Sequence, residues 1–165
     1  MLNLLATGHA ARILGARTLL LSPEVAGEML YLYADEHRTS KVQIDAALLT
    51  REGIDVDRIT LTSAEVALAA QYATEMDDGE AQTLAVAKER GVAVLSDDNA
   101  VTRAAPRDGV PLVSTLDLLQ RWGADASTQP AEVAAAAISM RRRANYAPPR
   151  GHALRSWYVG LIATP

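Results

Sequence analysis

The stretch Met76–Ala105, MDDGEAQTLAVAKERGVAVLSDDNAVTRAA, predicts a helix, a strand and a second helix in succession. Apolar side chains recur at helical spacing from Gly79 to Arg90, and Gly91 follows, as glycine often does after a helix. Val92–Ser96 is a short apolar run of the kind that forms a buried strand. The next residues, SDDNAV, carry side chains that cap a helix N-terminus. This succession is typical of α/β folds with parallel strands.

The flanking sequence repeats the alternation of strands and helices. Thr18–Ser22 predicts a buried strand, and the following SPEVAGEMLYLY, residues 22–33, predicts a helix with Ser22 as N-cap and Pro23 at its first position. Thr62 and Glu65 have the spacing of a capping box, which predicts a helix carrying Val66, Ala69, Ala73 and Met76 inward. The remaining predicted elements are a helix near 45–51, strands at 58–61 and 111–113, and helices at 115–123, 130–144 and 154–162.

These elements predict a three-layer α/β fold with a mostly parallel central sheet and helices on both faces. At 165 residues the chain is long enough to bury one sizeable core. A hydrophobic fraction of 49% with no Phe indicates aliphatic packing between closely spaced layers. We expect residues 1–125 to form the α/β domain and residues 126–165 to form a basic helical extension packed on it.

The composition excludes several classes of functional site and also bears on the expected cellular location. The chain has no Cys, which excludes disulfide frameworks, thiolate zinc sites and cysteine nucleophiles and agrees with a cytoplasmic location. It shows no secretory leader pattern and no run of about 18 apolar residues, so no membrane partner is expected. His9, His37 and His152 have no partner at metal or triad spacing. Trp122 and Trp157 are interpreted as packing residues.

Charge is distributed unevenly along the chain. The net charge of −4 argues against bulk attraction to phosphate. From residue 133 onward, however, there are five Arg and no Asp or Glu, so the 16 basic residues leave 11 upstream against 20 acidic ones. The tail is therefore +5 and the body −9. Either a basic surface lies beside an acidic site, or the arginines cover a solvated helix face.

Three carboxylates are predicted to meet at one edge of the sheet. A helix packed on a parallel sheet runs antiparallel to the strand that follows it, so Glu80 at the helix start should be level with Asp97 at the strand end. Glu28, in the helix after the first strand, should lie near that edge, where α/β sheets bind ligands. Grouped carboxylates are tolerated when Mg²⁺ or Mn²⁺ neutralises them. Alternatively, such acids only cap helices, as Asp78 and Asp98 could do.

The chain resembles the PIN-domain family, which includes toxin ribonucleases of the VapC type. Residues 76–105 together with GVPLVSTLDLLQRW, residues 109–122, resemble the second half of that domain. NLLATG, residues 3–8, and SPEVAGEMLYL, residues 22–32, resemble its first half. The tail NYAPPRGHALRSWY, residues 145–158, resembles a C-terminal extension found in one subgroup. The resemblance implies the PIN-like fold and covers about Met1 to Trp122.

The resemblance also implies a metal centre. In the family, acidic residues from four places hold one or two Mg²⁺ or Mn²⁺ ions, which activate water for attack on an RNA phosphodiester. Glu28, Glu80 and Asp97 match three of these places as catalytic metal ligands, with Asp98 and Asp78 as auxiliary ligands. The fourth acid, an Asp ending a first strand, would precede Met1. Two explanations stay open. Either the start codon was assigned downstream of the true one, or this protein has lost its first strand.

The function implied is that of a metal-dependent endoribonuclease, the toxin of a toxin–antitoxin pair. Its partners would be RNA, an antitoxin protein and a second copy of the chain, and the RNA backbone would be held by Arg103, Arg107, Arg141, Arg142 and Arg143. The alternative is a catalytically impaired PIN-like protein with a nucleic-acid-binding or regulatory role. A phosphotransfer or phosphatase-like domain ranks last, because it needs a nucleophilic Asp after the first strand and that Asp is missing here.

Overall fold

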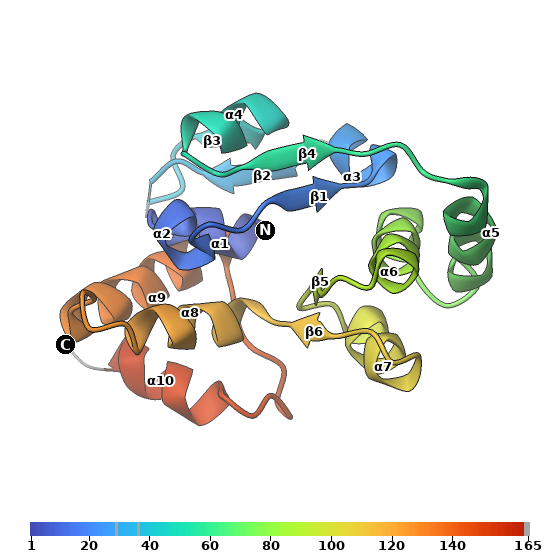
Figure 1. The fold of residues 1–165 in the computed structure, drawn as a ribbon. Helices are drawn as coiled ribbons and strands as arrows, with labels where there is room; N and C mark the ends of the chain where they lie inside the picture. The colour runs from blue at the N-terminus through green and yellow to red at the C-terminus, as the bar shows by residue number, and fades with distance from the viewer. Residues whose placement is uncertain (29, 36, 164–165) are drawn as a thin grey trace. The chain divides into compact units, whose positions relative to one another are not determined.

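The computed structural model describes residues 1–28, 30–35 and 37–163 and has a mixed α/β fold (Figure 1). Its strands are β1 (Leu19–Leu21), β2 (Leu30–Tyr33), β3 (Lys41–Ile44), β4 (Val56–Arg58), β5 (Val94–Leu95) and β6 (Leu112–Val113). Its helices are α1 (Leu2–Ala6), α2 (Ala10–Leu14), α3 (Pro23–Gly27), α4 (Ala46–Arg51), α5 (Ser63–Tyr72), α6 (Asp78–Arg90), α7 (Asn99–Arg107), α8 (Thr115–Gly123), α9 (Pro130–Ala144) and α10 (Arg155–Ala163). The predicted α/β class is confirmed.

The strands pair in three short ladders. β1 runs parallel to β4, and β5 runs parallel to β6. The backbone N–H of Ser96 also donates to the carbonyl of Val113 (3.2 Å), which carries the second ladder one residue beyond β5. These two ladders show the parallel pairing predicted from the alternation of strands and helices. β2 and β3 form an antiparallel hairpin, which the sequence interpretation did not include.

Two predicted element boundaries are wrong. The helix expected over residues 22–33 ends at Gly27, and Leu30–Tyr33 forms β2 instead. Glycine has a low helix propensity, and the alternating LYLY sequence suits a strand that pairs with β3. Met29, which the predicted helical spacing included, lies outside the described residues. The strand expected at 58–61 is also displaced, because β4 ends at Arg58 where its pairing with β1 ends.

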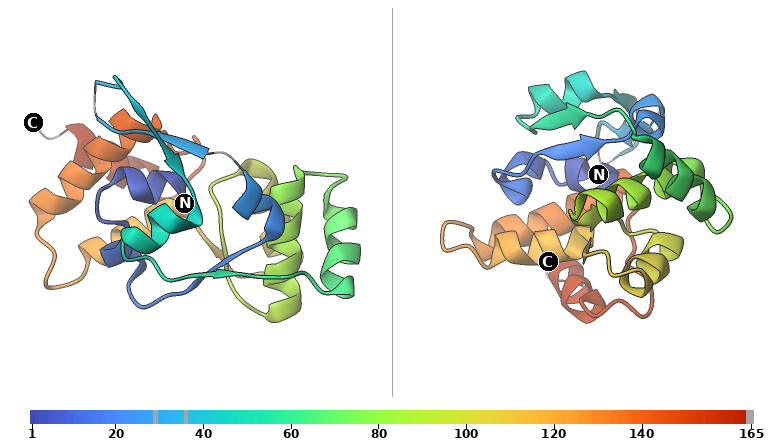
Figure 2. Two further views of the ribbon diagram at one scale, coloured as in Figure 1. Left: turned by 90° about the horizontal axis from the view of Figure 1, so that it is seen from above. Right: turned by 45° about the vertical axis from the view of Figure 1, so that its right-hand side comes forward.

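The elements belong to two compact units. The first comprises α1, α2, β2, β3, α4, α8, α9 and α10, and the second comprises β1, α3, β4, α5, α6, β5, α7 and β6. In the second unit, α5 and α6 lie side by side (Figure 2). Its core contains Leu84, Ala85, Val94, Val101 and Ala105, all at most 1% exposed. Small side chains on α6 thus bring neighbouring helices close to its backbone.

The α5 helix differs in part from its predicted orientation. The capping box of Thr62 and Glu65 is present, and Ala69 is buried as predicted. Val66, predicted to point inward, is 53% exposed. The helix ends at Tyr72; beyond it, Ala73 is exposed, whereas Met76 packs against the core as predicted. The buried face of α5 instead carries Glu65 and Tyr72.

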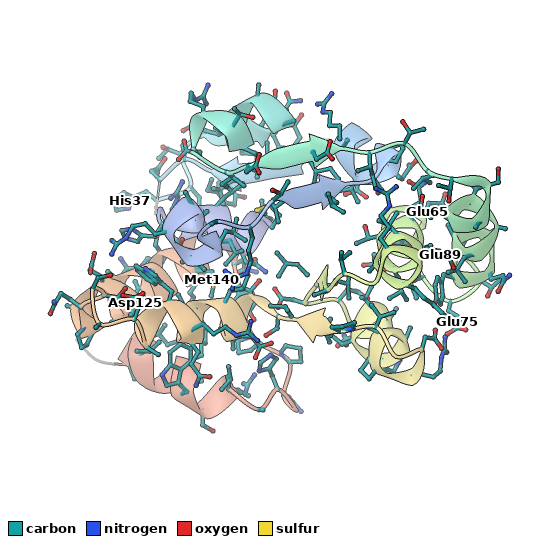
Figure 3. All side chains as sticks on the ribbon, viewed as in Figure 1. His37, Glu65, Glu75, Glu89, Asp125 and Met140 are labelled. Atoms are coloured by element: carbon teal, nitrogen blue, oxygen red, sulfur yellow. The ribbon has the colours of Figure 1, made fainter. Side chains whose placement is uncertain are left out.

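Glu65 is a buried acid that joins α5 to the end of α6 (Figure 3). Its Oε1 accepts a hydrogen bond from Arg90 Nε (2.6 Å), and its Oε2 accepts from Arg90 Nη2 (3.1 Å) and from the backbone N–H of Thr62 (2.7 Å). The bond from Arg90 lowers the pKa of Glu65 to about 2, against the opposing effect of burial. The same carboxylate therefore caps one helix and pairs with the next.

The first unit has its own helical core. Leu4, Leu14, Leu119, Met140 and Tyr158 are nearly inaccessible to solvent. α9 packs against α1 and α10, and the Tyr158 hydroxyl donates to the Ala137 carbonyl (3.2 Å). Trp122 is 6% exposed and stacks on His9 at 5.1 Å between ring centroids, which confirms it as a packing residue.

We predict that Glu65→Gln destabilises the protein by about 2 to 3 kcal/mol at pH 7. The amide keeps the shape of the side chain but leaves Arg90 without its counter-charge, and the loss falls below that of a fully buried pair because the Arg90 side chain is 31% exposed. Urea unfolding of both proteins measures the difference. Because the pKa of Glu65 is lowered from 4.5 to about 2, the contribution is complete above pH 4.5 and is lost as the pH falls toward 2.

Glu75→Gln is the matched control. Glu75 pairs with Arg107 at 2.8 Å, but both side chains are 51% exposed, so solvent screens the pair and its loss should be the smaller one. Equal losses in the two variants, or a Glu65→Gln difference that persists unchanged near pH 2, would contradict the role assigned to the buried pair.

Candidate functional site

The carboxylate of Glu28 lies against the backbone of Gly79, where α6 begins. Gly79 is buried, and a Cβ on this residue would collide with Glu28 Oε1. Its φ is not positive, so glycine is needed here for space and not for its conformational freedom. The backbone N–H of Glu24 also donates to Gln82 Oε1 (3.2 Å) across the same contact. Packing of α3 on α6 therefore brings Glu28 to the residue next to Glu80.

Glu80 is half-buried in the first turn of α6 and faces two further carboxylates. Its pKa is raised above the ordinary value, first by burial and then by the negative charges of Asp98 and Asp77. A side-chain interaction with Asp98 adds to the shift. Like charges held together at a partly buried position disfavour ionisation. The start of α6 thus concentrates more negative charge than the side chains there can neutralise.

Asp98 caps α7 and faces Glu80 at the same time. Its Oδ1 accepts from the backbone N–H groups of Ala100 and Val101, and its own N–H donates to Ser96 Oγ (3.1 Å). The capping interpretation of Asp98 is therefore correct but incomplete. Asp77 stands at the N-cap position of α6 without a side-chain capping bond, so its carboxylate is not used by that helix.

Asp97 occupies the position between the end of the β5–β6 ladder and the cap of α7. Its side chain is partly buried, and it follows Ser96, whose N–H is the last to bond across that ladder. The parallel strands therefore deliver Asp97 and Asp98 together beyond their carboxyl ends. This is the edge at which α/β folds bind their ligands.

The profile of the PIN-domain family matches residues 15–149. The chain belongs to this family. PIN domains are of the nuclease type, and the matched region contains every acidic residue described above. No curated protein and no solved structure matched the chain in the corresponding searches.

The structure brings some of the predicted site residues together and separates another. Glu80 and Asp98 interact electrostatically, Glu28 contacts the residue preceding Glu80, and Asp77, which was not among the predicted ligands, also acts on Glu80. Asp78 instead lines a surface groove between α5 and α6, together with apolar residues such as Val66 and Ala81. On α6, Asp78 and Glu80 are two positions apart, which points them to different sides of the helix.

The basic residues predicted to bind RNA differ in their exposure to solvent and in the partners that the fold gives them. Arg103 is exposed on α7, whereas Arg107 pairs with Glu75 (2.8 Å) and Asp108 (3.1 Å) and holds the pKa of Asp108 below its ordinary value. Arg141 and Arg142 are exposed at the end of α9. Arg143 is partly buried there and donates to the carbonyls of Tyr33 (3.0 Å) and Ala6 (3.2 Å). Arg107 and Arg143 thus have structural partners.

The oxygen donors at the start of α6 suit a hard divalent cation. Across residues 1–28, 30–35 and 37–163, no three His, Asp or Glu side chains stand close enough together to enclose a metal ion. Burial first, and then the negative charges of Asp98 and Asp77, raise the pKa of Glu80, and a cation would relieve the repulsion among these carboxylates. Glu28, Glu80, Asp97 and Asp98 stay the predicted ligands.

None of the helices in the described part of the chain combines the length and apolar character needed to span a bilayer.

Gly79 is the site residue that the sequence analysis did not single out. Its signal was a glycine in the first turn of a helix, where a better helix former would ordinarily stand. Such a glycine indicates close approach of another group, here the carboxylate of Glu28. The identity of that group could not be read from the sequence, because it comes from the residue that follows α3, 51 residues earlier.

We predict that Asp98→Asn lowers the pKa of Glu80 toward its ordinary value. The amide removes the nearest negative charge, and asparagine caps α7 as well as aspartate does, so the fold is retained. Carboxyl-detected NMR titration of the Glu80 side chain measures the change. Asp78→Asn serves as the control, since this residue faces the α5–α6 groove. A Glu80 pKa that responds more to Asp78→Asn than to Asp98→Asn would contradict the described geometry.

Proposed function

We propose that this PIN domain is a Mg²⁺- or Mn²⁺-dependent endoribonuclease. The observation that carries the proposal is the position of Glu80, half-buried at the start of α6 and facing Asp98 and Asp77, with Glu28 packed against the adjacent Gly79. A structure that gathers acids in this way is stabilised by cation binding. A nuclease-type family provides the chemical setting in which such a cation acts on a phosphodiester.

Glu28, Glu80 and Asp97 are the proposed catalytic ligands, with Asp98 as an auxiliary one. When bound, the cation supplies a water of lowered pKa and neutralises charge that develops on the phosphate. Glu80, in the first turn of α6, and Asp98, at the N-cap of α7, would help to hold the cation, and Gly79 leaves the space that lets Glu28 approach. Asp78 is left out of this set because it lines the α5–α6 groove.

Arg103, Arg141 and Arg142 are the proposed contacts to the RNA backbone. Their side chains are exposed, and contacts of this kind hold a strand without reading its sequence. We further propose that the protein is the toxin of a toxin–antitoxin pair, with an antitoxin protein and a second copy of the chain as partners. The resemblance to VapC-type ribonucleases supports this setting.

A catalytically impaired, RNA-binding role is the second candidate. It is favoured by one observation: among the described residues, no three His, Asp or Glu side chains stand close enough together to enclose a metal ion. In this case the acids at the start of α6 would bind a cation and RNA without turnover. Cleavage and binding assays on the same protein separate the two roles.

We predict Mn²⁺-dependent cleavage of a mixed RNA pool, reduced about 100-fold or more by Glu80→Gln. Removing this carboxylate weakens the hold on the cation and on the charge that it stabilises in the transition state. Initial rates of cleavage at saturating Mn²⁺ measure the effect. Glu89→Gln is the matched control, because Glu89 is an exposed acid near the other end of α6 (Figure 3).

Equal cleavage by the wild type, Glu80→Gln and Asp97→Asn would exclude the proposed centre. Absence of cleavage in all three proteins, with RNA binding retained, would support the impaired form instead.

We predict that Gly79→Ala lowers Mn²⁺ affinity about 10-fold while the protein stays folded. The added methyl group displaces the Glu28 carboxylate, and the cost to stability is small because alanine favours the helix by about 1 kcal/mol and the displaced group is a flexible side-chain end. Calorimetric Mn²⁺ titration and thermal unfolding measure the two effects. Gly27→Ala is the control, since a Cβ there meets no atom within 4 Å. Unchanged Mn²⁺ affinity in Gly79→Ala would remove Glu28 from the ligand set.

A further inference from the structure

The β2–β3 hairpin gathers aromatic and basic side chains on one face. Tyr31 pairs with Gln43, and Tyr33 pairs with Lys41. Side chains two residues apart on a strand point to the same side of the sheet, and directly paired residues share a face. These four therefore share a face, while Leu32 on the other face is 5% exposed. Tyr31 is 47% exposed, so part of its ring is accessible to a ligand.

Two cations lie over the ring of Tyr33. The guanidinium carbon of Arg38 is 5.3 Å from the ring centroid, and Lys41 Nζ is 5.7 Å from it. Both distances are within the range of cation–π attraction. The ring thus holds two positive charges beside Tyr31, which lies two residues earlier on the same strand.

Arg38 is fixed in place by the end of α9. Its φ is +59°, a conformation that costs a non-glycine residue about 1 kcal/mol or more. Its Nε donates to the Arg142 carbonyl (2.9 Å), and its Nη2 donates to Asn145 Oδ1 (3.2 Å). These bonds and the Tyr33 ring maintain the strained backbone, so the guanidinium is preorganised before any ligand arrives.

We propose that this face, made of Tyr31, Tyr33, Arg38, Lys41 and Gln43, binds single-stranded RNA. A base stacks on the Tyr31 ring, Lys41 and Arg38 contact the flanking phosphates, and Gln43 offers hydrogen bonds to a base edge. Aromatic side chains on a sheet surface bordered by cations are the means by which proteins bind unpaired bases. A duplex keeps its bases stacked on one another, so it cannot use the ring.

A second copy of the chain suits this face less well. A two-fold interface would set the Arg38 and Lys41 of one copy against the same cations of the other, and the centres of protein interfaces are poor in charge. A polyanion meets the same cations favourably.

The inference rests on the proposed function, because it assumes that RNA is the substrate, but its test requires no cleavage. Fluorescence anisotropy with a labelled 12-nucleotide RNA of mixed sequence, in EDTA, measures binding by the full chain. We predict that Tyr31→Ala weakens binding of the single strand about 10-fold, whereas Tyr31→Phe binds as the wild type does. Val159→Ala is the matched control, since Val159 is 45% exposed on α10. The matching duplex should bind more weakly than the single strand and be unaffected by Tyr31→Ala.

The charged residues have a separate signature. Lys41→Gln should reduce the slope of log K against log salt by about 0.7, the value for one phosphate contact on a single strand, whereas Tyr31→Ala should leave the slope unchanged. Photo-crosslinking of the unaltered protein to RNA containing 5-bromouridine should place the crosslink on β2. This readout does not depend on the folding of a variant.

Wild-type affinity in Tyr31→Ala, an equal effect of this variant on duplex RNA, or crosslinks confined to other segments would overturn the proposal. A fall in molar mass of Tyr31→Ala by light scattering would also overturn it and assign the face to a second copy. Glu80→Gln serves to separate the two proposals. If it binds RNA normally and only Tyr31→Ala weakens binding, the RNA-binding face is supported even where cleavage is absent.

Discussion

The packing of α6 is the constraint on which the candidate site depends. Along this helix the buried side chains are mostly small, and its far end is tied to α5 by the bidentate contact between Glu65 and Arg90. A helix held this closely cannot turn to relieve crowding at its beginning. Glu80 is therefore kept among other carboxylates at a free-energy cost that its raised pKa reports.

Glu65, which is buried, and Glu80, which is half-buried, differ in whether their surroundings stabilise the charge of the carboxylate. Glu65 is almost inaccessible to solvent, yet Arg90 and the Thr62 N–H stabilise its charge and lower its pKa to about 2. Glu80 is less buried, but its pKa is raised, first by burial and then by the negative charges of Asp98 and Asp77, because no cation among the described residues pairs with it as Arg90 does with Glu65. Folding stability accounts for the first arrangement. The second opposes stability, which is why we propose a ligand-binding role for it.

Positive charge has a similar division of roles. Arg90, Arg107 and Arg143 each have carboxylate or carbonyl partners and maintain the positions of helices and strands. Arg38 also donates to the Arg142 carbonyl and to Asn145 Oδ1, but it shares the Tyr33 ring with Lys41 and stands next to the exposed Tyr31. Counting arginines along the tail, as the sequence analysis did, could not separate these cases. The difference lies in which neighbours the fold supplies to each guanidinium.

The sequence by itself determined the α/β class and most helix boundaries, because capping residues and apolar spacing act locally. Helix α9 and the capping box of α5 occur where the local signals predicted them. Only the tertiary structure decided that Leu30–Tyr33 is a strand, since its pairing partner lies across a turn. It also decided that Gly79 accommodates Glu28 and that Asp78 faces a groove. Each of these depends on contacts between residues distant in sequence, whose free energies exceed the local preferences of the chain.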